Sequence, residues 1–263
     1  MYVMGVDIGS ASSNVMILGD NQVIVGKVVV PMGTGTSGPI RALEEALKQS
    51  GLSFEDISKT VATGYGRLNF KNADKQISEI TCHAKGVHYL IPTARTIIDI
   101  GGQDAKVIRL SSSGIISNFV MNDKCAAGTG RFLEVMARVL ETDVSALAEL
   151  AACAAHTCTI SSTCCVFAES EVISQLSAGN SSQDIAAGVH QSVARRVAGL
   201  VSRVGKQEDV VMTGGVAKNQ GVVNEMEKIL NIQIRVAPDS QLTGALGAAL
   251  FAWEEANEYA SVG

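Results

Sequence analysis

The feature that most constrains this chain is an order of predicted elements that occurs twice. In the first half, a strand over residues 2–8 ends in the turn Asp7-Ile8-Gly9-Ser10, and strands at residues 14–18 and 23–30 follow. In the second half, a strand over residues 96–100 runs into Asp99-Ile100-Gly101-Gly102, and strands at residues 106–110 and 115–121 follow. Because both halves share the order strand, Asp-x-Gly turn, strand, turn, strand, the sequence predicts an internal structural duplication.

Helical periodicity fills much of the remaining chain. Apolar residues recur at helical spacing most clearly over residues 183–204. Other helices are expected at residues 39–49, 131–141, 169–177 and 243–259, and further strands at residues 57–63 and 209–212. Helices that alternate with strands along the chain predict an α/β fold.

Composition narrows the classes of function. Of 263 residues, 46% are hydrophobic and 18% charged, which is typical of a folded chain. A net charge of −5 argues against a broad electrostatic grip on nucleic acid or anionic lipid. The sequence shows neither a signal peptide nor an apolar run of the ~20 residues that cross a bilayer. We therefore expect a cytoplasmic protein with no nucleic-acid or membrane partner.

Three glycine turns follow predicted strands, and each has the composition of a loop that binds phosphate or nucleoside. Glycine lets the backbone approach a phosphate closely, and serine hydroxyls and exposed N–H groups donate to it. An aspartate at a strand end can hold Mg²⁺, usually through water, and a glutamine beside it can orient an attacking water. Three unrelated tight turns are the competing interpretation, which the order and spacing of the turns disfavour. The candidate catalytic residues are Asp7 (with Mg²⁺ through water), Asp99, Gln103 and Asp104, and the candidate nucleotide-binding residues are Gly9, Ser10, Ser12, Ser13, Gly101, Gly102, Gly214, Gly215 and Asn219.

Two of the six cysteines lie in loops just before predicted helices. Cys125 is followed by the small residues Ala126-Ala127-Gly128, and Cys164 precedes Cys165-Val166-Phe167. A thiolate near a helix N-terminus is favoured by the helix dipole and by free N–H groups, which also tune the potential of an iron–sulfur cluster. An all-cysteine Fe₄S₄ cluster takes four thiolates, so two such cysteines indicate a symmetric dimer that supplies two from each subunit. Inert buried thiols are the competing interpretation.

At these turns the chain resembles the ATPase superfamily of actin, sugar kinases and heat-shock chaperones. The two Asp-Gly turns match its phosphate loops, and Gly214-Gly215 matches its adenosine motif. The resemblance implies a duplicated actin-like (ribonuclease H-like) fold whose two domains close on ATP–Mg²⁺ in a nucleotide cleft. It implies a first domain of residues 1–95 with 245–263, and a second domain of residues 96–244 that carries the cluster cysteines.

A narrower resemblance covers nearly the whole chain. Five segments, residues 62–67, 74–79, 99–104, 122–133 and 166–174, are similar to the activator components of 2-hydroxyacyl-CoA dehydratases. The resemblance implies a homodimer with one [4Fe–4S] cluster bridged by Cys125 and Cys164 of both subunits, and ATP in each subunit. It also implies an ATPase that takes an electron from ferredoxin or flavodoxin and delivers it to a dehydratase for radical dehydration of a 2-hydroxyacyl-CoA.

The chain departs from this family's pattern at three positions. Ala11 and Asn14 stand where threonine and lysine are common, and Cys165 stands where threonine is usual. Three other functions stay open: the ATP-driven electron donor of a benzoyl-CoA reductase, a small-molecule kinase with Asp104 as its catalytic aspartate, and a nucleotide sensor that regulates a partner. The acyl-CoA that the partner dehydrates cannot be read from the sequence, since this chain would never touch it.

Overall fold

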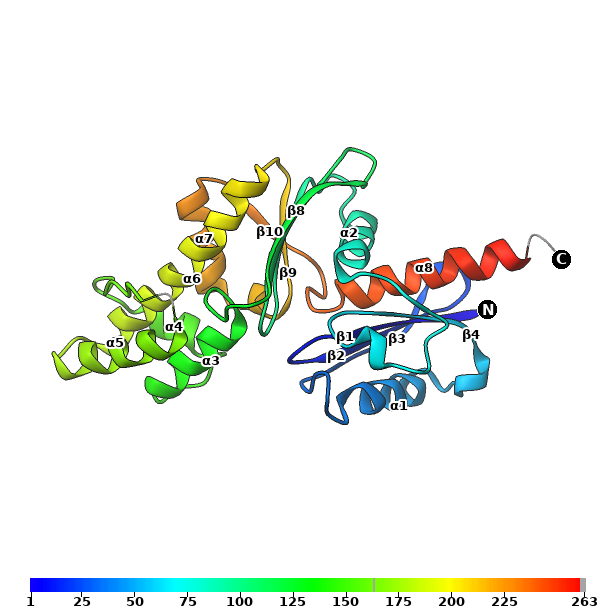
Figure 1. Cartoon of the computed structure of the whole chain (residues 1–263), viewed down its shortest axis with the longest axis horizontal. Coiled ribbons are helices and arrows are strands. Elements are labelled where there is room, and N and C mark those ends of the chain that lie inside the picture. Colours follow the sequence, from blue (N-terminus) through cyan, green and yellow to red (C-terminus); the bar gives the residue numbers. More distant parts are fainter. Residues whose placement is uncertain (163, 261–263) are drawn as a thin grey trace. The chain divides into compact units, whose positions relative to one another are not determined.

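The chain forms two compact units, each built on one five-stranded sheet (Figure 1). The structure is a computed structural model that describes residues 1–162 and 164–260, so Thr163 of the Cys164 loop lies outside the described residues. Unit 1 comprises residues 1–94, 110–116 and the chain from Ala237 onward, and unit 2 comprises residues 95–109 and 117–236. No helix of the described residues combines the length and the apolar character needed to cross a membrane.

The sheet of unit 1 has the strand order β3-β2-β1-β4-β5. Strand β1 pairs antiparallel with β2 and parallel with β4, so it lies at the centre of the sheet. The strands are β1 (Tyr2–Ile8), β2 (Ser13–Leu18), β3 (Ile24–Val30), β4 (Ile57–Thr63) and β5 (Lys75–Gln76).

The sheet of unit 2 repeats this topology. Its order is β10-β9-β6-β7-β8, in which β6 takes the place of β1, pairing antiparallel with β7 and parallel with β9. The strands are β6 (Thr96–Ile100), β7 (Ala105–Leu110), β8 (Ile116–Asn122), β9 (Val210–Thr213) and β10 (Ile234–Val236). The duplication predicted from the order of elements is therefore confirmed.

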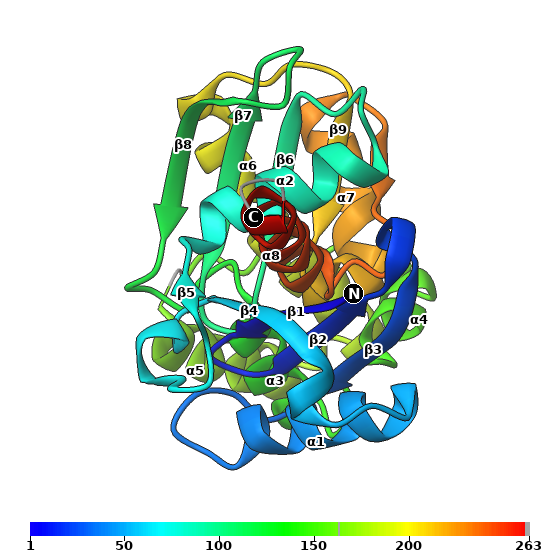
Figure 2. The same cartoon turned by 90° about the vertical axis from the view of Figure 1, so that its right-hand side faces the viewer.

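Helices cover both faces of the sheet in unit 1. Helix α1 (Gly38–Ser50) packs on one face, and α2 (Glu79–Leu90) and α8 (Thr243–Ala260) pack on the other, as Figure 2 shows. Helix α8 approaches so closely that a Cβ on Gly5 of β1 would lie 2.0 Å from the Ala245 carbonyl oxygen. In the same way, a Cβ on Gly247 would lie 1.8 Å from the Cys82 carbonyl oxygen on α2. Glycine at these positions lets two backbones meet where any side chain would separate them.

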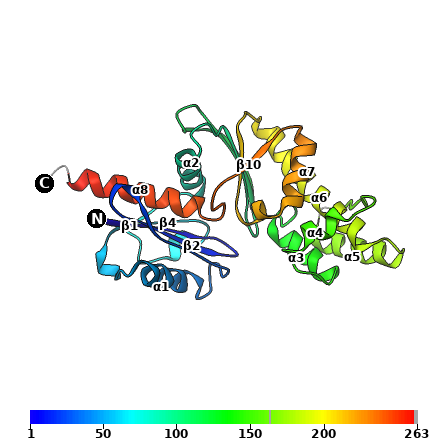
Figure 3. The ribbon, with the colours of Figure 1, turned by 180° about the vertical axis from the view of Figure 1, so that it is seen from behind.

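The helices of unit 2 surround one hydrophobic core (Figure 3). Its largest helix, α6 (Ser182–Val204), buries the apolar residues that its sequence period predicts, including Ile185, Val189 and Val193. The other helices are α3 (Gly130–Val139), α4 (Leu147–Ala152), α5 (Cys165–Ser177) and α7 (Gln220–Leu230).

Most predicted elements are present, with some boundaries corrected. The helix expected at 169–177 begins at Cys165, and the one expected at 131–141 runs from Gly130 to Val139. Helices α2 and α4 and the short strands β5 and β10 were not predicted. A helix was expected to open directly at the third glycine turn. After the third glycine turn comes a 3₁₀ helix, Gly215–Lys218, and α7 begins only at Gln220.

Candidate functional site

Asp7 lies at the carboxyl end of the central strand of unit 1, where two glycines make room for its carboxylate. A Cβ on Gly64, whose φ is +85°, would lie 2.4 Å from Asp7 Oδ1, and a Cβ on Gly244 would lie 2.4 Å from Oδ2. Gly244 is in the first turn of α8, so the carboxylate faces a helix N-terminus, which favours negative charge. The side chain of Asp7 is 7% exposed. The fold therefore fixes this carboxylate rigidly.

Two polar neighbours extend this end of the sheet. Asn14 lies directly across from Asp7 on β2, and Thr63 lies directly across from it on β4, so all three side chains share one face. Asn14 is 4% exposed, and its Oδ1 has no hydrogen-bond partner among the described residues. A buried amide oxygen without a partner beside a carboxylate suits a hydrated cation, because hard cations and their waters prefer oxygen ligands. These residues fit a Mg²⁺ ion held through water.

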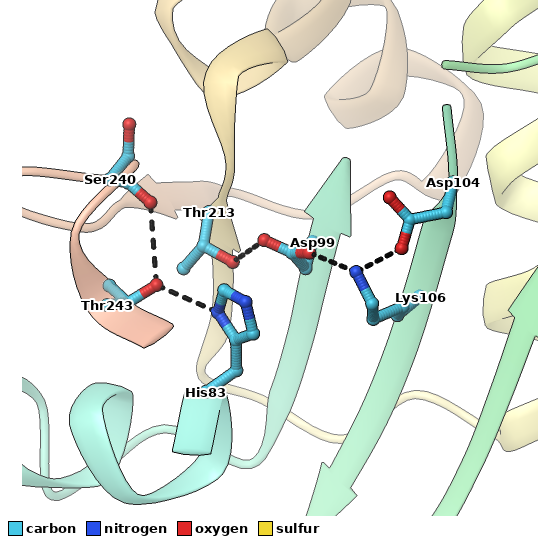
Figure 4. Close-up of polar contacts among 7 residues, drawn as sticks. All are labelled: His83, Asp99, Asp104, Lys106, Thr213, Ser240 and Thr243. Atoms are coloured by element: carbon cyan, nitrogen blue, oxygen red, sulfur yellow. Dashed lines mark hydrogen bonds and ion pairs between the residues drawn. The ribbon is translucent and has the colours of Figure 1, made fainter. Parts of the chain in front are cut away.

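A buried histidine, His83, is hydrogen-bonded to the start of α8 (Figure 4). His83 Nδ1 lies 3.0 Å from Thr243 Oγ1, and Thr243 Oγ1 in turn donates to the Ser240 carbonyl oxygen at 3.4 Å. Because the threonine hydroxyl has a single proton, this arrangement makes His83 Nδ1 the donor to Thr243. His83 thus supports the first turn of α8.

The three serines of the first glycine turn differ in burial: one is buried and two are partly exposed. Gly9 N donates to the Ser12 carbonyl oxygen at 2.9 Å, which closes the turn. Ser13 is fully buried and its hydroxyl donates to the Met32 carbonyl oxygen at 2.8 Å. Ser10 and Ser12 are partly exposed. Of the serines predicted to meet phosphate, Ser10 and Ser12 have the exposure that such a contact needs, whereas the Ser13 hydroxyl already has a partner.

Asp99 and Asp104 of the second glycine turn are joined by a buried lysine (Figure 4). Lys106 Nζ lies 3.0 Å from Asp99 Oδ2 and also forms an ion pair with Asp104. Asp99 Oδ1 accepts a hydrogen bond from Thr213 Oγ1 at 2.7 Å. The side chains of Lys106 and Asp99 are each 3% exposed, and that of Asp104 is 21% exposed. The two predicted catalytic aspartates of this turn are thus held together by one cation.

Lys106 is a site residue that the sequence analysis did not single out. Its signal was present, because a lysine next to the apolar residues Val107 and Ile108 in a predicted strand needs a buried partner. In an antiparallel hairpin with the predicted strands, Lys106 also lies directly opposite Asp99.

The second turn is also bonded to the start of α3. Gly130 N donates to the Gly101 carbonyl oxygen at 2.9 Å, and Arg131 N donates to the Gly102 carbonyl oxygen at 2.7 Å. These are free N–H groups of the first helical turn, which need partners outside the helix. Gln103 is exposed. The turn therefore shares two hydrogen bonds with the helix that follows the Cys125 loop.

The third glycine turn lies against the second. Gly214 has φ +84°, and a Cβ there would lie 2.3 Å from the Ile100 carbonyl oxygen. Asn219 caps α7, where its Oδ1 accepts from Val222 N at 3.2 Å. Its Nδ2 is buried and has no hydrogen-bond partner among residues 1–162 and 164–260. The structure thus brings Gly214 to the end of β6 and gives Asn219 a capping role, with an amide donor left over for a ligand.

The Cys125 loop is shaped by side-chain hydrogen bonds to its backbone. Asn122 Nδ2 donates to the Cys125 carbonyl oxygen at 2.8 Å, and Thr129 Oγ1 donates to the Ala126 carbonyl oxygen at 2.7 Å. Gly128 has φ +81°, and a Cβ there would lie 2.9 Å from Arg196 Cγ. Thr129 is the N-cap of α3, so Cys125 comes four residues before a helix start, as predicted.

Cys164 is itself the N-cap of α5, and it is exposed. Its carbonyl oxygen accepts from Ala168 N at 2.8 Å, the first hydrogen bond of the helix. The pKa of the neighbouring Cys165 thiol is raised by burial and by the negative charge that the thiolates of Cys125 and Cys164 would carry. Both predicted cluster cysteines are therefore close enough to Cys165 to influence its charge.

A cavity of about 370 Å³ separates the two cysteine loops from α6. It is lined by Ala127 and Gly128 after Cys125, by residues 159–161 before Cys164, and by Arg195 and Arg196 of α6. Neither Cys125 nor Cys164 lines this cavity. The fit to an inorganic cluster therefore rests on the two thiols, which both lie just before a helix start. Within residues 1–162 and 164–260, no group of three or more His, Cys, Asp or Glu side chains is arranged to hold a metal ion.

Comparison with known proteins supports a single family. The chain is 64% identical over 258 residues to the activator of lactoyl-CoA dehydratase from Anaerotignum propionicum, covering 98% of this chain and 100% of that one. Its fold matches the activator of the 2-hydroxyisocaproyl-CoA dehydratase from Clostridium difficile with bound ADPNP at a TM-score of 0.97, with 56% identity and coverage of 100% and 98% of the two chains.

A more distant match defines the fold class. A ROK family glucokinase from Streptomyces griseus in complex with glucose and AMPPNP aligns at a TM-score of 0.56 and 14% identity, over 97% of this chain and 100% of that one. This likeness concerns the fold alone, and it confirms the expected actin-like and sugar-kinase architecture. Residues 4–252 match the BadF/BadG/BcrA/BcrD ATPase family, and we conclude that the chain belongs to that family.

Proposed function

We propose that this chain is the ATP-dependent activator of a 2-hydroxyacyl-CoA dehydratase, to which it delivers one low-potential electron. The observation that carries the proposal is full-length similarity, at 64% identity, to the activator of lactoyl-CoA dehydratase. The glycine turns and the two cysteine loops support it, because they supply the chemistry that nucleotide binding and an iron–sulfur cluster each need.

ATP and Mg²⁺ would be bound by the three glycine turns. Asp7 is the proposed Mg²⁺ residue, through water, with the partnerless Asn14 Oδ1 beside it. Ser10 and Ser12 would donate to phosphate oxygens, and Asn219 Nδ2 would donate to the nucleoside. Lys106 holds the carboxylates of Asp99 and Asp104 in place, and Gln103 would orient a water beside them. The proposed domains are residues 1–95 with 245–263, and residues 96–244.

Cys125 and Cys164 of two copies would together supply the four thiolates of one [4Fe–4S] cluster. When bound, such a cluster supplies a one-electron redox centre. The helices that begin after the two cysteines would present N–H groups toward the sulfurs of a bound cluster. We propose a cytoplasmic homodimer that accepts its electron from ferredoxin or flavodoxin.

The proposed link between the nucleotide and the cysteines is short. The second glycine turn bonds to Gly130 and Arg131 at the start of α3, and Cys125 lies in the loop that leads into this helix. A change at the phosphate groups that moves the turn would therefore move the start of α3 as well.

The decisive experiment is anaerobic purification, with iron and acid-labile sulfide counted per dimer and an EPR spectrum recorded after reduction. We expect about four of each per dimer, and their loss in Cys125→Ser or Cys164→Ser. Cys153→Ser, at an exposed thiol outside both loops, is the matched control. A metal-free protein after anaerobic reconstitution would contradict the redox activator and leave the kinase or nucleotide-sensor functions. Stimulation of a benzoyl-CoA reductase in place of a dehydratase would assign the partner differently.

A further inference from the structure

We infer that Glu171 is a positioning residue that fixes the loop before Cys164, and so sets where that thiol stands at the start of α5. The inference rests on the proposed function for its link to a cluster. The contact itself lies within a single chain and does not depend on a bound cluster.

The carboxylate of Glu171 accepts three hydrogen bonds from two consecutive residues. Ser161 donates to Oε1 through its backbone N at 2.9 Å and through its hydroxyl at 2.8 Å. Ser162 N donates to Oε2 at 2.8 Å. Both carboxylate oxygens are used, and two of the three donors are backbone groups that no helix or sheet satisfies. The interaction thus fixes the path of the backbone and not merely one side chain.

The Glu171 carboxyl is ionised throughout the physiological pH range. Its partial burial favours the neutral form, but the hydrogen bonds from Ser161 and Ser162 outweigh that effect and lower the pKa of the carboxyl to about 2. Hydrogen bonds to a charged acceptor are roughly twice as strong as neutral ones. The three bonds therefore act as one charge-assisted clamp, with no neutral form near physiological pH.

The position of the clamp relative to Cys164 gives it its role. Glu171 lies seven residues after Cys164 on α5, which is about two helical turns, and Ser162 lies two residues before it. The side chain therefore folds the loop back along its own helix and closes a hydrogen-bonded ring that contains both Cys164 and Cys165. The same loop lines the cavity beside α6, through Ser161. Loss of the Glu171 hydrogen bonds would therefore increase the mobility of the backbone at Cys164.

The chain offers a matched control on the same helix. Glu169 is exposed, and it makes no hydrogen bond or ion pair with any residue in 1–162 or 164–260. Glu171→Gln and Glu169→Gln remove the same charge from α5, but only the first alters the clamp. In Glu171→Gln the amide oxygen can still accept from Ser161, while the NH₂ group faces Ser162 N and cannot accept from it.

The first test measures hydrogen exchange of single backbone amides by NMR in the cluster-free full chain. We expect the Ser162 amide to exchange about 10- to 100-fold faster in Glu171→Gln, from the usual strength of a hydrogen bond to a charged group. Ser161 should change less, and Glu169→Gln should match the wild type. Unchanged exchange at Ser162 would overturn the clamp, whether or not the protein ever binds iron.

The second test concerns the thiol. In protein reconstituted anaerobically, iron release to a chelator should be several-fold faster in Glu171→Gln than in Glu169→Gln, and the EPR signal of the reduced protein should shift. The urea midpoints of the cluster-free variants, measured in parallel, show how much of any change in iron release comes from a general loss of stability. Faster Ser162 exchange with unchanged iron release and EPR signal would overturn the positioning role. A wild type that takes up no iron would refute the proposed function, and the exchange experiment would still decide the clamp.

Discussion

Lys106→Met is the substitution whose effect the structure defines most sharply. The lysine ammonium lies between Asp99 and Asp104, and the side chains of Lys106 and Asp99 are each 3% exposed. Methionine has a similar length and no charge. The variant therefore leaves one buried carboxylate and one mostly buried carboxylate facing each other with no cation between them.

The expected loss in the free energy of unfolding follows from the charged groups that remain after the substitution. Removing one partner of a buried ion pair typically costs about 3–5 kcal/mol, because the remaining charge is desolvated and unpaired. The hydrogen bond from Thr213 to Asp99 survives, which favours the lower part of that range. Lys228→Met is the control, since Lys228 pairs with Glu225 at 2.6 Å but its side chain is 71% exposed. An exposed pair of this kind is worth about 0–1 kcal/mol.

Urea unfolding can assign this loss to unit 2. The sequence has a single tryptophan, Trp253, which packs on the core of unit 1, so its fluorescence reports that unit. Far-UV circular dichroism reports both units. We expect Lys106→Met to lower the circular dichroism midpoint strongly, and Lys228→Met to leave it nearly unchanged. Equal effects of about 1 kcal/mol or less in the two variants would refute the buried ion-pair network and the role we give Lys106.

Three further predictions concern other parts of the fold. Burial lowers the pKa of His190 from its ordinary 6.5 to about 4. The unfolded chain therefore binds a proton at His190 more readily than the folded chain does. Up to about 3 kcal/mol of the free energy of unfolding should be lost as the pH falls from 6.5 to 4. Urea midpoints measured over this pH range should show the loss in the wild type and not in His190→Leu. Gly64→Ala should destabilise the protein more than Gly51→Ala, although both have positive φ, because only at Gly64 would the Cβ meet the Asp7 carboxylate. Gly51→Ala should cost about 1–2 kcal/mol, and equal midpoints would contradict the steric argument. Gly130→Pro removes an N–H that bonds to the second glycine turn, so calorimetry should show affinity for a non-hydrolysable ATP analogue falling about 2- to 10-fold, while Gly130→Ala, which keeps the N–H, should not.

The sequence was sufficient for features that depend on local patterns. Strand β1 has the predicted bounds, because a short apolar run that ends in Asp and Gly is unambiguous over seven residues. The duplication was predictable for the same reason, since it needs only the order of elements and not their packing. Cys164 was correctly placed before a helix, although the helix begins at Cys165, four residues earlier than its apolar period suggested.

Features that depend on distant contacts could not be predicted. Asn219 was selected for its place after a glycine turn, but its cap exists only because α7 begins at the next residue. Ser13 belongs to a serine-rich turn, and only the Met32 carbonyl, 19 residues away, shows that its hydroxyl is already bonded. Glu171 gave no signal at all, because nothing in a helix sequence indicates that one of its carboxylates reaches back to two amides.

The place of α8 in unit 1 has a consequence for how this protein is made. The ribosome completes all of unit 2 before it begins α8, yet α8 covers one face of the first sheet and contacts β1 directly at Gly5. Until α8 emerges, Val3, Met16 and Leu18 lack most of the apolar residues that cover them on that face. The N-terminal unit is therefore synthesised first but cannot complete its fold until α8 has emerged. During translation, the incompletely covered face of its sheet exposes apolar surface that a chaperone would protect.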